Sequence, residues 1–382
     1  MNLTAIAILF AAALVLSIIL YLPSKGLAFV FGIIDHPGER KIHKKPVPYL
    51  GSLMIFGGFA LGLYLYGVYF NGAAHFKHTT RLGIVISLSA MFLLGVADDK
   101  FDIPALFKFF LQIAVASIPV FFGIGIDRVT NPLGGVIMLH PVVSHIVTVF
   151  WLVALANAMN LIDGMDGLCS GVSAISIFFI MIVSYLTGSN VIYPMAALLG
   201  GILGYLIFNF PPARIFMGDS GALFIGYAIG IFSLVSNIKT SFAITLMLPV
   251  VLLLVPILDT LLAIIRRMKN GQRIFGADKN HLHHRLLLLT GNRPRRVLAI
   301  IYTTCALLGI FSLVTYALPR EFTPLLLFIL FENIAFAVFL LNLYEKRHET
   351  YDRFKQYVKN TVFGAAPDTP TEEPHGKKKK RK

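Results

Sequence analysis

The chain has 382 residues, of which 57% are hydrophobic and only 14% are charged, and its formal net charge is +14. A soluble protein of this length needs far more charge to cover its surface, so an ordinary soluble globular fold is excluded. The two cysteines, Cys169 and Cys305, stand inside apolar runs and match neither a zinc site nor a disulfide framework. In a soluble protein the net positive charge would indicate binding to nucleic acid. Here we expect it to come from basic cytoplasmic segments and from a local site for phosphate.

Apolar runs long enough to cross a membrane recur along the chain. A hydrocarbon core of roughly 30 Å requires about 20 apolar residues in a helix. The pattern therefore predicts an all-α polytopic membrane protein with about 11 transmembrane helices. The first run lacks a basic leader and a cleavage site, so we expect a retained helix rather than a signal peptide. In chain order the predicted spans are 2–22, 49–70, 81–97, 104–125, 142–158, 168–187, 190–208, 220–236, 241–265, 297–317 and 323–343.

The distribution of positive charge predicts the orientation of these spans. Of the 33 Lys and Arg residues, 28 fall in alternate connecting segments. These segments are residues 23–48, 98–108, 159–167, 209–219, 266–296 and 344–382. Cytoplasmic segments carry an excess of Lys and Arg, so the amino terminus is predicted outside and the carboxy terminus in the cytoplasm. We divide the chain into a transmembrane catalytic domain, 1–343, with its active-site loops in the cytoplasm, and a basic, partly disordered cytoplasmic tail, 344–382.

Carboxylates gather in three of the predicted cytoplasmic segments. Asp98 and Asp99 follow the third span, Asp163 and Asp166 stand in IDGMDG after the fifth, and Asp219 stands in FMGDSG before the eighth. Each carboxylate alone is typical of a solvated helix cap. Together, beside glycines and on one predicted face of the membrane, they indicate a site for a hard cation. Mg²⁺ prefers oxygen ligands and is usually held by one or two carboxylates plus substrate phosphates.

Two basic segments supply the opposite charge. The stretch ADKNHLHHR contains His281, His283, His284 and Arg285. It lacks partner cysteines, so we favour a clamp for phosphate over a zinc site. A basic loop that only contacts lipid headgroups is the alternative. Lys44 and Lys45 precede a Pro-Val-Pro stretch, which predicts an extended loop passing under the site or, alternatively, a simple positive anchor.

These motifs resemble those of the polyprenyl-phosphate N-acetylhexosamine-1-phosphate transferases. The likeness covers most of the chain, from about residue 35 to residue 296, with the motifs in the family order. The HLHH form and the PVP loop are more similar to the GlcNAc-1-phosphate branch than to phospho-MurNAc-pentapeptide translocase, which typically shows three consecutive histidines. The motifs are IHKKPVPYLG (42–51), ADDKFDI (97–103), NLIDGMDGL (160–168), FMGDSG (216–221), PILDT (256–260) and ADKNHLHHRL (277–286).

The resemblance implies a Mg²⁺-dependent enzyme of the bacterial cytoplasmic membrane, with Mn²⁺ able to substitute. It implies transfer of GlcNAc-1-phosphate from UDP-GlcNAc to undecaprenyl phosphate at the cytoplasmic face, with release of UMP. This reaction initiates cell-envelope polysaccharide synthesis, and the resemblance implies no nucleic acid partner. Another UDP-N-acetylhexosamine or UDP-MurNAc-pentapeptide is the alternative donor, and a homodimer is suggested by family analogy alone.

The resemblance also implies a role for each candidate residue. Asp98 would deprotonate or orient the lipid phosphate, with Asp99 supporting the metal or the geometry. Asp219 would bind Mg²⁺, with Asp163 as a second candidate for metal or nucleotide. A one-step displacement is favoured over a phospho-aspartyl intermediate. The uridine pocket would be formed by Asn160, Asp163, Asp166 and Phe216, and the diphosphate, sugar and lipid phosphate would be held by His281, His283, His284, Arg285, Lys44 and Lys45.

Two other classes of protein compete with this interpretation. An anion transporter would carry charges in the middle of several spans and an internal repeat, whereas here the spans are almost free of charge and no repeat is evident. A CDP-alcohol phosphotransferase would carry a spaced Asp/Gly/Ala-Arg signature, which the sequence lacks. Both alternatives are therefore less favoured than the transferase.

Overall fold

A computed structural model of the chain describes residues 1–35, 46–70, 76–130, 136–236 and 282–318, together with Leu254 and Phe322. The chain divides into two compact units, Met1–Ala317 and Leu318–Lys382, and every element named below belongs to the first. The predicted domain boundary at 343/344 lies outside the described residues. The helices are α1 (Leu3–Ile19), α2 (Tyr21–Phe31), α3 (Ser52–Tyr69), α5 (His78–Phe101), α6 (Ala105–Phe121), α7 (Pro141–Ile162), α8 (Leu168–Leu186), α9 (Ile192–Asn209), α10 (Gly218–Val235), α13 (Leu282–Leu289) and α14 (Pro294–Ala317).

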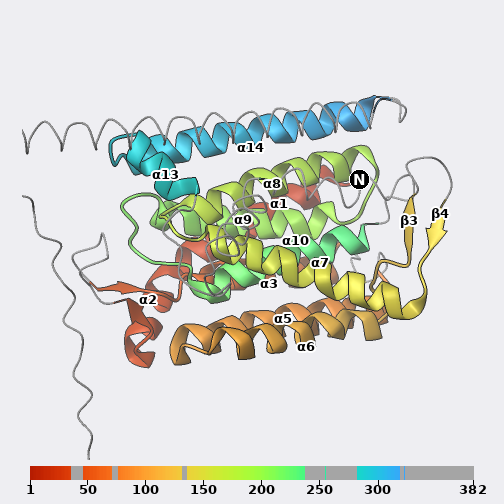
Figure 1. Cartoon of the computed structure of the whole chain (residues 1–382), viewed down its shortest axis with the longest axis horizontal. Coiled ribbons are helices and arrows are strands. Elements are labelled where there is room, and N and C mark those ends of the chain that lie inside the picture. The colour runs from red at the N-terminus through yellow and green to blue at the C-terminus, as the bar shows by residue number, and fades with distance from the viewer. Residues whose placement is uncertain are drawn as a thin grey trace, which may run out of the picture. The chain divides into compact units, whose positions relative to one another are not determined.

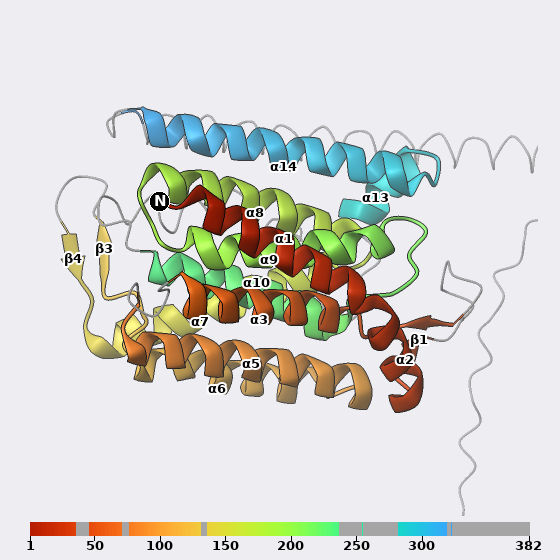
Figure 2. The ribbon, with the colours of Figure 1, turned by 180° about the vertical axis from the view of Figure 1, so that it is seen from behind.

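The first unit is a bundle of roughly parallel helices (Figures 1 and 2). Helix α14 lies against α8 on one side of the bundle, and α5 and α6 lie together on the other. Between them, α9 and α10 are buried along most of their length. A helix that is apolar on all sides belongs in a protein core or in lipid, and α9 and α10 form the core of this bundle.

Seven of the described helices are long and apolar enough to cross a membrane, or up to eight if α1 and α2 form one broken span bent by 45°. The prediction of an all-α polytopic membrane protein is therefore confirmed. Helix α6 is apolar but has only 17 residues. Apart from Leu254, the predicted spans 241–265 and 323–343 lie outside the described residues, so the count of 11 and the orientation of the termini stay predictions.

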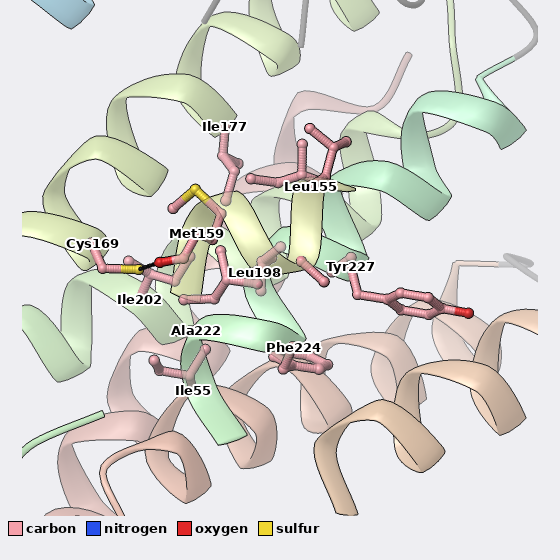
Figure 3. Packing of buried hydrophobic residues seen from close by; sticks show 14 of the residues in the cluster. Ile55, Leu155, Met159, Cys169, Ile177, Leu198, Ile202, Ala222, Phe224 and Tyr227 are labelled. Atoms are coloured by element: carbon pink, nitrogen blue, oxygen red, sulfur yellow. Dashed lines mark hydrogen bonds between the residues drawn. The ribbon is translucent and has the colours of Figure 1, made fainter. Parts of the chain in front are cut away.

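Glycines allow the central helices to approach closely. A side chain at Gly226 of α10 would meet the carbonyl of Leu155 in α7, and one at Gly201 of α9 would meet the carbonyl of Ile55 in α3. Such contacts are typical of helix pairs in membranes, where small residues permit tight van der Waals packing. Figure 3 shows the apolar side chains that fill the remaining space, with the Cys169 thiol donating to the Met159 carbonyl at 3.6 Å.

Two short antiparallel ribbons complete the described part of the fold. Strand β1 (Ile34–Asp35) pairs with β2 (Val47–Pro48), and β3 (Arg128–Thr130) pairs with β4 (Val136–Met138). The ribbon β3–β4 lies at the opposite end of the bundle from α2 (Figure 1). Strand β2 consists of Val47 and Pro48 of the Pro-Val-Pro motif. The chain continues from it into α3 beside the candidate site described next.

Candidate functional site

The carboxylate-rich end of the bundle is assembled from helix ends rather than from loops. Asp98 and Asp99 lie in the last turn of α5, and Asp219 lies in the first turn of α10. Segments 98–108 and 209–219 were expected to be connecting loops. In the structure, part of each is helical, because α5 ends at Phe101, α6 begins at Ala105 and α10 begins at Gly218. A side chain at Gly95 would collide with the backbone of Ser220. This glycine therefore allows α5 and α10 to meet at the site.

Asp99 caps the amino terminus of α10. Its Oδ1 accepts the backbone N–H of Asp219 at 2.7 Å, and its Oδ2 accepts the N–H of Ser220 at 3.1 Å. The Ser220 hydroxyl also donates to Asp99 Oδ2 at 2.5 Å. The first N–H groups of a helix have no partner within the helix and favour negative charge, so a carboxylate is well suited to this position. A side chain at Gly218 would fill the space of the Asp99 carboxylate, and Gly218 itself adopts a φ of +72°.

Asp98 and Asp219 share a cationic partner. The ammonium group of Lys108, in the first turns of α6, forms an ion pair with Asp98 Oδ2 at 2.7 Å and another with Asp219 Oδ2. The second oxygen of Asp98 accepts the N–H of Ile103 at 3.1 Å. The Asp219 side chain is 37% exposed, whereas that of Asp98 is only 10% exposed. Asp98 is therefore fixed by the protein, while Asp219 faces the open side of the site.

The end of α7 brings two more predicted residues to this place. Asn160 lies in its last turn and its side chain faces the Asp219 carboxylate. Asp163 directly follows the helix. Burial, followed by the negative charges of Asp219, Asp99 and Asp166, raises the pKa of the Asp163 carboxyl to about 8. Negative charge is therefore crowded here, and a bound cation would relieve the crowding.

An amide pair formed by the buried Gln112 and the half-buried Asn157 fixes α6 against α7 next to these residues. The Asn157 side chain donates to Gln112 Oε1 at 2.6 Å and to the Val153 carbonyl at 2.8 Å. Gln112 lies one turn after Lys108, and Asn157 lies one turn before Asn160. Because buried amides are costly when they lack partners, this pair holds the helix faces that carry Lys108 and Asn160 in register.

The IDGMDG loop is fastened to the segment that joins α9 and α10. Asp166 Oδ2 accepts the N–H of Ala213 at 2.9 Å. Asn209, the last residue of α9, accepts the N–H of Gly167 at 2.8 Å and donates to the Ile215 carbonyl at 3.1 Å. Gly167 adopts a φ of +75°, which favours glycine at this turn. Asp166 therefore shapes the loop through its own hydrogen bond.

Phe216, just before α10, is bound through its backbone to the segment that contains the Pro-Val-Pro motif. Its N–H donates to the Pro48 carbonyl at 2.8 Å, and its carbonyl accepts the N–H of Gly51 at 2.9 Å. The Phe216 and Tyr49 rings are tilted by 50° with centroids 5.6 Å apart. Burial and the nearby carboxylates of Asp35, Asp99 and Asp163 raise the pKa of Tyr49 above its ordinary value. The Pro-Val-Pro motif thus does reach the site.

The remaining predicted residues are only partly described. Lys44, Lys45 and His281 lie outside the described residues. His283 and His284 belong to α13, and Arg285 of the same helix is half-buried. The structure therefore places three of the six on α13, and the positions of the other three stay predictions.

The residues can be compared with the needs of a divalent cation. Across the described ranges, no three His, Cys, Asp or Glu side chains converge in a metal-binding group. Mg²⁺ nevertheless needs only one or two protein carboxylates when substrate phosphates complete its shell. Asp98 and Asp219 converge on one cationic group, the Lys108 ammonium. Their oxygen donors therefore fit Mg²⁺ as a cation held jointly with substrate.

Three residues of the site were missed by the sequence interpretation. Lys108 is a lone cation near the start of an apolar run, and that position is the signal that could have identified it. Asn209 resembles an ordinary helix end before Phe-Pro-Pro. Tyr49 follows the Pro-Val-Pro motif and resembles an interfacial aromatic residue. Each is identified only by the contacts that the fold creates.

Comparisons with known proteins agree on one family. The model for glycosyl transferase family 4 matches residues 81–237, which run from α5 to the end of α10 and include all five predicted aspartates. A protein of Bacillus subtilis (strain 168) named probable undecaprenyl-phosphate N-acetylglucosaminyl 1-phosphate transferase is 34% identical over 359 residues, covering 94% of this chain and 97% of that protein.

Two further relatives carry similar names. The decaprenyl-phosphate N-acetylglucosaminephosphotransferase of Mycolicibacterium smegmatis (strain ATCC 700084 / mc(2)155) is 36% identical over 299 residues, covering 72% of this chain and 73% of that protein. The undecaprenyl-phosphate alpha-N-acetylglucosaminyl 1-phosphate transferase of Escherichia coli (strain K12) is 26% identical over 340 residues, covering 87% of this chain and 88% of that protein. The likeness therefore extends over most of each relative.

Proposed function

Because the chain belongs to glycosyl transferase family 4, the polyprenyl-phosphate N-acetylhexosamine-1-phosphate transferases, we propose that it transfers GlcNAc-1-phosphate from UDP-GlcNAc to undecaprenyl phosphate. The products are undecaprenyl-diphospho-GlcNAc and UMP, formed at the cytoplasmic face of the bacterial inner membrane. The reaction starts the synthesis of an envelope polysaccharide. The observation that carries the proposal is the group of Asp98, Lys108 and Asp219 at the end of the bundle.

The reaction brings two anionic phosphates together, and the site residues offset that repulsion. Lys108 supplies a fixed positive charge between the two carboxylates. Asp219 would hold Mg²⁺, with Asp98 and Asp163 as further candidate ligands and Mn²⁺ able to substitute. When bound, the cation neutralises charge on the donor diphosphate. Asp219 is the preferred ligand because its side chain is the more exposed of the pair.

Asp98 is proposed to orient the lipid phosphate and to accept its proton. The N–H of Ile103 holds one carboxylate oxygen, so the direction of the other is fixed. In a one-step displacement, a lipid phosphate oxygen bonds to the β-phosphorus while the bond from that phosphorus to the bridging oxygen breaks. UMP leaves with the bridging oxygen. Most of the rate enhancement then comes from alignment and charge neutralisation.

The nucleotide is proposed to bind next to the IDGMDG loop. Asn160 and Asp163 at the end of α7 offer polar groups to the uridine, and the Phe216 ring offers an aromatic surface for uracil. Asp166 contributes by shaping the loop through Ala213. Asp99 contributes by holding the first turn of α10.

The basic segments are proposed to complete the substrate contacts. His281, His283, His284 and Arg285 would hold the diphosphate or the sugar, and Lys44 or Lys45 would hold the lipid phosphate. Helix α13 carries two of these histidines and is joined to α14 by a short turn. A homodimer remains an oligomeric state suggested by family analogy.

The position of the transferred label tests this proposal. Purified protein in detergent is given undecaprenyl phosphate, Mg²⁺ and UDP-GlcNAc carrying ³²P only at the β-phosphate. Transfer of GlcNAc-1-phosphate moves the label into the lipid fraction and releases unlabelled UMP. Transfer of the sugar alone would leave the label on UDP, and the absence of any reaction would favour a transporter or another activity.

The same assay distinguishes the donors. Unlabelled UDP-GlcNAc, UDP-GalNAc and UDP-MurNAc-pentapeptide are added as competitors at equal concentration. UDP-GlcNAc is expected to reduce lipid labelling most strongly. Stronger competition by either of the other nucleotides would replace GlcNAc in the proposal while leaving the reaction class intact.

A further inference from the structure

Helix α14 packs on α8 and contacts the end of the IDGMDG loop through Tyr302. The Tyr302 hydroxyl donates to the Gly167 carbonyl at 2.6 Å. The same carbonyl accepts the N–H of Gly171 at 2.9 Å in the first turn of α8. The side-chain hydroxyl therefore fixes the residue at which the loop becomes a helix. Figures 1 and 2 show α14 running alongside α8 over much of its length.

The fit between Tyr302 and the loop depends on two glycines. A side chain at Gly171 would overlap the Tyr302 ring, so the ring lies directly on the backbone of α8. A side chain at Gly167 would lie 3.5 Å from the Tyr302 hydroxyl, and the φ of +75° at this residue already disfavours any other amino acid. The loop and the tyrosine are thus closely matched in shape.

A second residue of α14, Arg295, contacts the segment that joins α9 and α10. Its guanidinium donates two hydrogen bonds to the Pro211 carbonyl, at 3.2 and 3.0 Å, and lies 5.9 Å from the centre of the Phe210 ring. Pro211 belongs to the segment that leads to Phe216 and Asp219. Arg295 is therefore placed to restrain that segment, although its side chain is exposed.

The start of α14 also determines where α13 lies. The turn between the two helices has Gly291 and Asn292 at φ values of +66° and +56°. It is closed by hydrogen bonds from the N–H of Thr290 to the Leu286 carbonyl and from that of Asn292 to the Leu287 carbonyl, at 2.9 and 2.8 Å. A single helix thus contacts the nucleotide loop, the segment before α10 and the histidine-bearing helix.

We propose that Tyr302 and Arg295 are positioning residues that hold the IDGMDG loop and the segment before α10 in register for the nucleotide sugar. The inference rests on the proposed function, because that function assigns the segments to the donor. Tyr302 acts through Gly167, and Arg295 acts through Pro211. Neither residue needs to touch the substrate.

The Tyr302 contact is tested first without relying on activity. Hydrogen–deuterium exchange is compared between wild type and Tyr302→Phe, with Tyr316→Phe at the far end of α14 as the matched control. Faster exchange confined to residues 163–171 is expected in Tyr302→Phe alone. Unchanged exchange there, in a variant with wild-type exchange elsewhere, would overturn the inference even if the proposed reaction were wrong.

The kinetic consequence is measured with the β-labelled donor. Tyr302→Phe is expected to raise KM for UDP-GlcNAc about three- to ten-fold, the size expected for loss of one hydrogen bond, with kcat and the KM for lipid phosphate within about two-fold of wild type. An equal loss through kcat, or an unchanged donor KM, would contradict a positioning role.

Arg295 provides a second variant that is less able to disturb the bundle, because its side chain is exposed. Arg295→Ala is expected to raise the donor KM in the same direction, and Arg295→Lys to restore only part of the effect because lysine lacks the planar fork. The exposed neighbour Arg296→Ala is the matched control. A donor KM equal in Arg295→Ala and Arg296→Ala would remove Arg295 from the proposal.

Discussion

The Asp99 carboxylate of α5 accepts both the backbone N–H and the hydroxyl of Ser220 in α10. Its other oxygen accepts the N–H of Asp219. Adjacent aspartates in one helix therefore have different tasks, because Asp98 faces Lys108 while Asp99 supports the turn that carries Asp219. Substitution of Asp99 should therefore affect stability through the start of α10.

Asp99→Asn should destabilise the protein, because an amide offers one acceptor oxygen and no charge to the start of α10. The expected loss is about 1–3 kcal/mol, together with reduced activity. Thermal unfolding in detergent measures it, with Asp102→Asn at the exposed end of α5 as the control. A variant as stable as Asp102→Asn would show that the cap contributes nothing.

Lys108→Met should abolish most of the transfer, because it leaves Asp98 and Asp219 as neighbouring anions without their shared partner. We expect a fall in kcat of about 100-fold or more, in the range seen when a fixed electrostatic group is removed. Lys100→Met is the control, since Lys100 lies at the end of α5 over the rings of Phe31 and Phe101. Similar rates for the two variants would exclude Lys108 from the site.

His284→Ala should weaken use of the nucleotide sugar if α13 contacts the diphosphate. The expected result is a higher KM for UDP-GlcNAc with an unchanged KM for undecaprenyl phosphate. His78→Ala, at the opposite end of α5 from Asp98, serves as the control. Equal kinetics for both variants would leave the histidine segment as a contact for lipid headgroups.

Asn209→Ala should be among the more damaging substitutions in the loop region. It leaves the buried N–H of Gly167 without its partner, at a cost of about 1–3 kcal/mol, and it removes one of two donors to the Ile215 carbonyl, which keeps the Tyr205 hydroxyl at 3.4 Å. Thermal unfolding and donor KM should both worsen. Asn190→Ala in the turn before α9 is the control, and identical melting of the two variants would contradict the role of Asn209.

Much of the bundle could be predicted because membrane helices must satisfy their backbone internally and be apolar in lipid. Helices α7, α8 and α9 lie close to the spans read from hydrophobicity. Helix α2 was not predicted, because Pro23, Ser24, Lys25 and Gly26 ended the first predicted span at residue 22 and placed most of this helix in a connecting segment. The ribbons β1–β2 and β3–β4 were too short to leave a period-two pattern.

The aspartates of the candidate site were predicted, but the contacts that hold them in place were not. Spacing and glycines indicated that Asp98, Asp163 and Asp219 belong together, and the fold brings their helix ends to one place. Only the family resemblance gave Asp98 and Asp99 different roles, because their difference in contacts depends on which side of α5 faces α10. Tyr302 and Lys108 were missed because a contact between distant helices leaves no local pattern.

The most direct test of the site is the cation dependence of transfer in Asp219→Asn. Release of UMP from UDP-GlcNAc is measured in excess EDTA and then with increasing Mg²⁺ or Mn²⁺, using Asp102→Asn as the control. Wild type and control should be inactive in EDTA and recover with either cation, whereas Asp219→Asn should stay folded and fail to recover. Full activity in EDTA, or a wild-type cation response in Asp219→Asn, would contradict the assignment of this carboxylate group as the transfer site.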